Sequence, residues 1–157
     1  MKCYFITICI LLSSCLQKNN NDKTNNNINE HKVDAEIIKS ISISTFGGEM
    51  GYYQSLKITT DSLYYNFNLE VDTTKRKSEK KINSHYKLED IVNANQLINF
   101  AKIKNGESRQ PVDGTDTEIE IKTNQKTYSI VNGEGNISWQ TIEIAISKIL
   151  NNEFTTE

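Results

Sequence analysis

Apolar and small polar residues alternate along the segment Ile41–Phe46, which reads ISISTF. Side chains of a β-strand point alternately to the two faces of a sheet, so this pattern predicts a strand with one buried face. The pattern recurs in YYQSLKI, at Tyr52–Ile58, and in LYYNFNLEV, at Leu63–Val71. The residues expected on the buried face of these two strands are Tyr52, Leu56 and Ile58, and Leu63, Tyr65, Phe67, Leu69 and Val71. Glycines at positions 47, 48 and 51 and turn formers at Thr60–Ser62 separate the segments, which predicts an antiparallel meander of three strands.

Two later parts of the chain also have strand-like patterns. The segments TEIEIKT and KTYSIV, at Thr117–Thr123 and Lys126–Val131, alternate on either side of Asn124 and Gln125 and predict a hairpin. A weaker pattern at Ile82–Leu88 indicates a candidate strand after the meander. We therefore expect a sheet of about five strands, formed by a meander and then a hairpin.

Helical spacing of apolar residues appears in two segments. We expect one helix within Glu89–Ile103, although its asparagines are poor helix formers. The C-terminal segment has a clearer apolar stripe, with Asn136 or Ser138 available as the N-cap. The residues of that stripe are Trp139, Ile142, Ala145, Ile146, Ile149 and Leu150. The order of these elements predicts the α+β class, an antiparallel sheet with both helices packed on one face.

The N-terminus has the pattern of a signal peptide. Lys2 is the only charged residue before an apolar segment at Tyr4–Leu12, which is much shorter than the ~20 residues of a membrane-spanning helix. No alanine precedes Ala35, so the common A-x-A cleavage site is absent. The residues Leu12-Ser13-Ser14-Cys15 stand in its place.

This tetrapeptide resembles the lipobox of bacterial lipoproteins, which is a leucine, two small residues and a cysteine. The resemblance implies a thioether-linked diacylglycerol on Cys15, cleavage just before Cys15, and acylation of the new N-terminus. Two or more acyl chains suffice for stable anchoring. The alternative is an ordinary signal peptide with a cysteine near the cleavage site. The lipobox predicts a signal peptide at residues 1–14 and a membrane partner reached through Cys15.

A polar segment follows the predicted anchor. Seven of the fourteen residues from Gln17 to Glu30 are asparagine, a composition that buries too little apolar surface to fold. Residues 15–34 are therefore expected to form a lipidated, disordered tether, with a reach of about 25 Å. Residues 35–157 are expected to form a single α+β domain without cysteine, since the three cysteines are Cys3, Cys9 and Cys15.

The net charge and the predicted lipid anchor indicate which partners the protein can bind and where it is located. The net charge is −2, which argues against a nucleic-acid binder because such a protein needs a basic face. The predicted location is the bacterial cell envelope. In enterobacteria, an aspartate directly after the lipidated cysteine retains a lipoprotein in the inner membrane. Residue 16 is a leucine here, so the rule is not met and the outer membrane is favoured. The predicted domain is similar in general pattern to small α+β envelope lipoproteins of AT-rich Gram-negative genomes, without a diagnostic motif.

The segment FGGEMGYY contains a candidate binding loop with Phe46, Met50, Tyr52 and Tyr53. It matches no phosphate-loop motif and joins two predicted strands, so no helix N-terminus is available for an anion. A flexible hairpin with glycines at positive φ is the structural interpretation. A mobile, aromatic-flanked loop that contacts a ligand or partner is the functional one.

Two charged segments offer further candidates. DGTDTEIE contains Asp113, Asp116, Glu118 and Glu120, but it lacks the residue order of a calcium loop, so we expect no metal. Glu118 and Glu120 are expected on the solvated face of a strand. The run KRKSEKK, at Lys75–Lys81, is interpreted as a solvated loop, and contact with anionic lipid headgroups is the alternative.

No catalytic constellation or cofactor motif is recognisable. His85 is the only histidine outside the tether and has no identifiable catalytic partners, so we expect a structural histidine. We predict a membrane-anchored, non-enzymatic binding or structural module with an unknown protein partner. The alternatives are an immunity or inhibitor lipoprotein against an envelope-acting toxin or hydrolase, and a small hydrolase with paired carboxylates.

Overall fold

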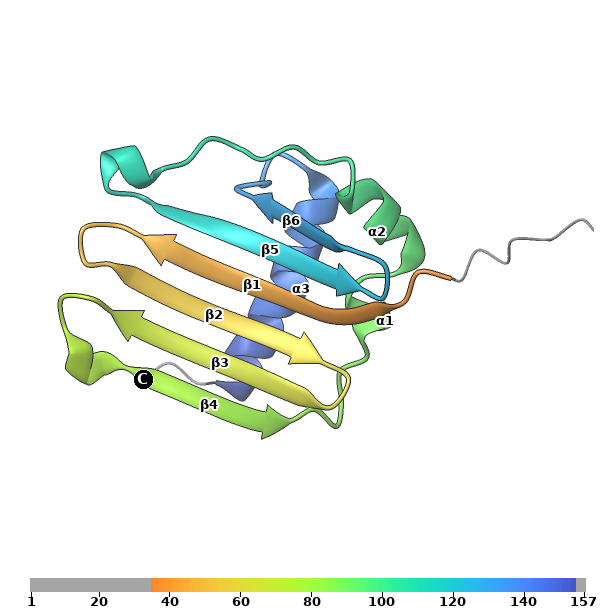
Figure 1. The fold of residues 1–157 in the computed structure, drawn as a ribbon, viewed down its shortest axis with the longest axis horizontal. Helices are drawn as coiled ribbons and strands as arrows, with labels where there is room; N and C mark the ends of the chain where they lie inside the picture. The colour runs from red at the N-terminus through yellow and green to blue at the C-terminus, as the bar shows by residue number, and fades with distance from the viewer. Residues whose placement is uncertain (1–34, 155–157) are drawn as a thin grey trace, which may run out of the picture. The chain divides into compact units, whose positions relative to one another are not determined.

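Six strands form one antiparallel sheet, with the order β4-β3-β2-β1-β5-β6 (Figure 1). The computed structural model describes residues 35–154, which belong to one compact unit. The predicted signal peptide, Cys15 and the tether lie outside the described residues. The strands are β1 (Ile38–Gly47), β2 (Tyr52–Thr59), β3 (Ser62–Leu69), β4 (Lys77–Ile82), β5 (Thr115–Thr123) and β6 (Thr127–Val131). The predicted α+β class is confirmed.

The predicted meander and hairpin are both present. Strands β1, β2 and β3 are joined by short turns, and β5 and β6 pair across Asn124 and Gln125. β1 pairs with β5 on its other side, with Ile43 opposite Ile119, so it lies at the centre of the sheet. The segment between β4 and β5, which contains two helices, thus connects the strands of the meander to the hairpin of β5 and β6 (Figure 1).

The predicted strand at Ile82–Leu88 is wrong, and so is the loop at Lys75–Lys81. The fourth strand is β4, which lies at the sheet edge beside β3. Asn83 ends it, because the side chain of Asn83 donates to the carbonyls of Thr59 and Tyr86 at 2.7 and 2.8 Å and accepts from the Tyr86 amide at 2.9 Å. β4 alternates poorly because its face toward the helices is only partly buried, and its lysines discourage pairing with another chain at the sheet edge.

The predicted helix within Glu89–Ile103 is two short helices. The helices of the chain are α1 (Leu88–Ile91), α2 (Ala94–Phe100) and α3 (Ile137–Glu153), with single 3₁₀ turns at Thr73–Lys75 and Gln110–Val112. Asn93 separates α1 from α2 because its side chain caps the second helix and exchanges hydrogen bonds with Gln96. α3 agrees with the prediction, and Asn136 is its N-cap.

The core lies between the sheet and the helices. The buried side chains come from alternate strand positions and from the apolar stripe of α3, including Ile41, Leu56, Ile119 and Trp139, each 0 % exposed. Val71 does not join this face as predicted, because it follows β3 and is exposed. The helices pack behind one face of the sheet, and no described element covers the other face (Figure 1). We call this uncovered side the open face.

Candidate functional site

The open face carries mainly polar side chains. In β1, β2 and β3 these belong to the residues between the apolar ones in each alternating pattern. The register makes Ser44 a neighbour of Ser55 in β2 and Ser42 a neighbour of Lys57. On the other side of β1, Glu118 and Glu120 of β5 lie opposite the same two serines. Small hydroxyl side chains therefore lie at the centre of the open face, with longer charged ones on both sides.

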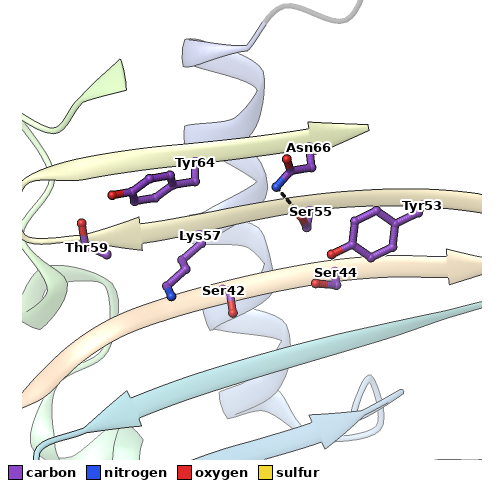
Figure 2. Close-up of a pocket in the computed structure, with 8 residues that line it drawn as sticks. All are labelled: Ser42, Ser44, Tyr53, Ser55, Lys57, Thr59, Tyr64 and Asn66. Atoms are coloured by element: carbon purple, nitrogen blue, oxygen red, sulfur yellow. Dashed lines mark hydrogen bonds between the residues drawn. The ribbon is translucent and has the colours of Figure 1, made fainter. Parts of the chain in front are cut away.

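The small serines leave a depression of about 400 Å³ over β1, β2 and β3. Figure 2 shows the eight side chains that line it, all on the same side of the sheet. They are Ser42, Ser44, Tyr53, Ser55, Lys57, Thr59, Tyr64 and Asn66. Because a serine reaches less far from the sheet than a tyrosine or lysine, the serines form the floor and the longer side chains form the walls.

Several polar groups of the depression have spare hydrogen-bonding capacity. Among the described residues, the Asn66 amide donates one long hydrogen bond, to the Ser55 hydroxyl at 3.5 Å, and its oxygen accepts one from Ser78 at 2.9 Å. Thr59 is occupied, since its hydroxyl donates to Asp61 at 2.6 Å. The ammonium group of Lys57 enters no ion pair, side-chain hydrogen bond or ring contact with any of the described residues.

Charge is distributed unevenly across the open face. The Lys80 ammonium in β4 lies 5.2 Å from the ring centroid of Tyr64, so Lys80 and Lys57 provide positive charge on the β2–β4 side. Glu118 and Glu120 provide negative charge on the β5 side, beside Ser44 and Ser42, and Lys122 follows in the same row opposite Ser40. The serine floor lies between the two.

The structure separates the residues of the predicted binding loop. Phe46 and Tyr53 are cross-strand neighbours on the open face. Tyr52 lies on the helix side, where its ring packs edge-to-face on Phe67 at 5.7 Å, and burial together with the nearby Tyr65 raises its pKa. Met50 lies at the tip of the turn and is 54 % exposed. Only Phe46 and Tyr53 are therefore placed to contact one ligand on the open face.

Asp116 is buried and fully engaged in hydrogen bonds. Its carboxylate accepts from the Ser108 hydroxyl and the Arg109 amide at 2.7 Å, and from the side chains of Asn132 and Gln110 at 2.7 and 2.9 Å. These donors hold the pKa of Asp116 well below its usual range. The carboxylate anchors the loop before β5 and has no free oxygen lone pair directed at a ligand.

Other titratable groups lie away from the depression. His85 is exposed in the Asn83 turn, where its backbone amide donates to the Asn83 side chain at 3.4 Å. Burial raises the pKa of Glu143 on α3, and the neighbouring Glu134 adds to that rise. Residues 35–154 contain no group of three or more metal-binding side chains placed to hold an ion.

Comparison with known protein families and with curated proteins found no match to this chain. Within the described range, no helix is both long and apolar enough to cross a bilayer. The open face was missed from the sequence, although the serines of ISISTF were visible as the polar half of the alternation. Strand order, which the alternation does not contain, brings those serines together with Ser55 and Lys57.

Proposed function

We propose that the protein is a lipid-anchored, non-enzymatic binding module of the bacterial cell envelope, and that the open face of its sheet is the binding surface. The depression over β1, β2 and β3 carries this proposal. Antiparallel sheets commonly leave one face to solvent, but here that face combines small hydroxyls, tyrosine walls and a lysine that pairs with no acidic group among residues 35–154. Those groups bind and orient polar ligands.

The lipobox-like sequence supports the anchored location. An acylated Cys15 would hold the domain at a membrane surface, and Leu16 favours the outer membrane. A module without enzymatic activity is supported by the chemistry of the open face. Its buried carboxylate, Asp116, is engaged by four donors, and no histidine in the described part of the chain lines the depression with its serines.

Intact-mass measurement of the native protein from its membrane fraction tests the anchor. We expect a chain that begins at Cys15 and carries acyl chains, and a Cys15→Ala variant without them. A soluble, unlipidated native protein would overturn the location.

A substitution that fills the depression with a large side chain tests whether the open face is the binding surface. Ser44→Arg places a long side chain on the serine floor, and Ser84→Arg, at an exposed position in the turn before α1, is the matched control. We expect a stoichiometric companion to co-purify with the native protein and the control but not with Ser44→Arg. Turnover of a substrate by the purified protein, abolished by changing one Asp, Glu or His85, would contradict a non-enzymatic role.

An immunity or inhibitor lipoprotein is the second candidate, and the loops at one end of the sheet favour it (Figure 1). Met50, Val71 and Val112 are 54 %, 63 % and 79 % exposed there. The Val71 amide donates to the Met50 carbonyl at 3.4 Å, and the Gly48 amide donates to the Gly114 carbonyl at 3.0 Å. Exposed apolar groups on connected loops suit insertion into a partner's cleft.

Sensitivity to an envelope-acting toxin encoded beside this protein tests that candidate. Cells without the protein should become sensitive, and Met50→Asp should fail to restore resistance. Unchanged sensitivity after deletion would exclude the inhibitor role against that toxin.

A further inference from the structure

We propose that the depression binds an acidic oligosaccharide, with a sugar carboxylate at Lys57 and sugar hydroxyls at Ser44 and Ser55. This inference rests on the proposed function, because it names a ligand class for the same surface. The charge, the hydrogen-bonding groups and the shape of the depression each support this ligand class.

Lys57 gives the depression a positive charge. Its ammonium group has no acidic partner among the described residues, and Figure 2 shows its side chain extending over β1 beside Ser42. Tyr64 of β3 lies opposite Lys57, and Lys80 of β4 lies opposite Tyr64, so Lys80 adds positive charge two strands away from Lys57. A carboxylate is the complementary group, and hydrogen bonds to a charged donor are about twice as strong as neutral ones.

The acidic residues of β5 limit where ligand charge can lie. Glu118 and Glu120 face the serine floor from the side opposite Lys57. A ligand with dense negative charge would be repelled by these two carboxylates. The geometry therefore points to a ligand whose carboxylate lies at the Lys57 ammonium, beside Ser42, while its neutral part covers Ser44 and Ser55.

The neutral part of the ligand must both donate and accept hydrogen bonds. Serine hydroxyls and the Asn66 amide do both, which matches the hydroxyl groups of a sugar. The rings of Tyr53 and Tyr64 give apolar faces at the walls, against which the C–H faces of a sugar ring can pack. The volume of about 400 Å³ falls within the range of small-ligand sites.

A protein partner fits this depression less well. Protein interfaces are centred on buried apolar or aromatic anchors that fill pockets, whereas the floor here is hydroxyl-bearing. Exposed apolar side chains lie outside the depression, at Met50 and Val71 in the loops at one end of the sheet and at Ile82 on the edge strand β4.

Isothermal titration calorimetry on the full chain, purified in detergent from the membrane fraction, tests the proposal. The probes are the disaccharide N-acetylglucosaminyl-N-acetylmuramic acid, which has one carboxylate, digalacturonate, and N,N′-diacetylchitobiose, which is neutral. We expect at least one acidic probe to bind about tenfold more tightly than the neutral one, the ratio expected for one charged hydrogen bond. The acidic probe that binds more tightly identifies the source of the sugar acid.

Substitutions locate the binding. Lys57→Gln should remove the preference for the acidic probe, Lys57→Arg should keep it, and Ser55→Val should weaken all probes. Lys148→Gln, an exposed change on α3 behind the sheet, is the control and should change nothing.

Three outcomes would overturn the proposal. They are no binding of any probe, equal affinity for acidic and neutral probes, or equal losses from Lys57→Gln and Lys148→Gln. A co-purifying protein displaced by Ser44→Arg, without sugar binding, would overturn the ligand class but leave the open face as the binding surface. An unlipidated native protein would instead overturn the proposed location, so the two failures are distinguishable.

Discussion

The side-chain amide of Asn132 donates a hydrogen bond to the carboxylate of Asp116, with 2.7 Å between Nδ2 and Oδ1. The same nitrogen donates to the Glu107 carbonyl at 2.8 Å, and the Asn132 Oδ1 accepts from the Thr117 amide at 2.8 Å. Asn132 adopts a φ of 51°, a left-handed conformation that asparagine tolerates better than most residues. One buried pair thus joins the end of β6, the start of β5 and the loop between α2 and β5.

This pair predicts a pH-dependent contribution to stability. The pKa of Asp116 is lowered in the folded protein, so its carboxylate stabilises the fold above the unfolded-state pKa of about 4. That contribution is lost as the pH falls from about 4 toward the lower pKa of the folded state. We expect Asp116→Asn to be less stable than the native protein at pH 7, and the gap to narrow progressively as the pH falls below about 4.

Thermal melting of both proteins from pH 7 to pH 2 measures this gap. Asp61 and Asp72, whose pKa values are also lowered by hydrogen bonds from Thr59 and Thr74, shift both curves equally. Parallel curves at all pH values would contradict a stabilising role for the Asp116 charge.

Gly133 is predicted to be intolerant of any side chain. A Cβ there would lie 2.4 Å from Cδ1 of Trp139, whose ring is fully buried. Gly133→Ala should lower the free energy of unfolding by about 1–3 kcal/mol, the usual cost of overpacking. Urea unfolding monitored by the fluorescence of Trp139 measures it. Gly135→Ala is the control, because nothing lies within 4 Å of its added Cβ. Equal losses in the two variants would refute the packing argument.

Asn93 is predicted to hold the boundary between α1 and α2. Its side chain accepts from the Gln96 amide at 3.0 Å, so Asn93→Ala should cost about 1 kcal/mol of stability. Asn93→Asp should retain most of it, because aspartate accepts the same bond. The exposed Asn95→Ala should be neutral or slightly stabilising, since alanine favours a helix. Chemical denaturation of the three variants measures these changes in stability. An unchanged stability of Asn93→Ala would contradict the capping role of Asn93.

Phe154 is predicted to fasten the end of α3 to the sheet. Its ring stacks on Tyr65 with 5.0 Å between centroids, and the Lys81 ammonium lies 4.7 Å from its ring centroid. Lys81 also donates to the Glu153 carbonyl. Phe154→Ala should destabilise the protein by about 3–5 kcal/mol, as buried aromatic truncations do. Ile144→Ala, at an exposed position of α3, should change stability by less than about 0.5 kcal/mol. Calorimetry on both variants tests the difference, and similar melting temperatures would refute it.

The strands found from the sequence share a local property. Ile41–Phe46 and Thr117–Thr123 alternate because each is buried on one face only, and that alternation is written in consecutive residues. β4 was missed because its face toward the helices is only partly buried, so its lysines and Glu79 do not alternate with apolar residues. The break between α1 and α2 was missed because the capping by Asn93 competes with a continuous apolar stripe.

The sequence by itself determined which segments form β1, β2, β3, β5, β6 and α3, because the burial of one face leaves a period of two or 3.6 residues. Only the tertiary structure decided that β5 lies beside β1, that Asp116 is buried among four donors, and that Ser44 meets Ser55 on the open face. These relationships depend on strand order and register, which hydrogen bonding between distant segments establishes. Local periodicity carries no information about which strand becomes the neighbour.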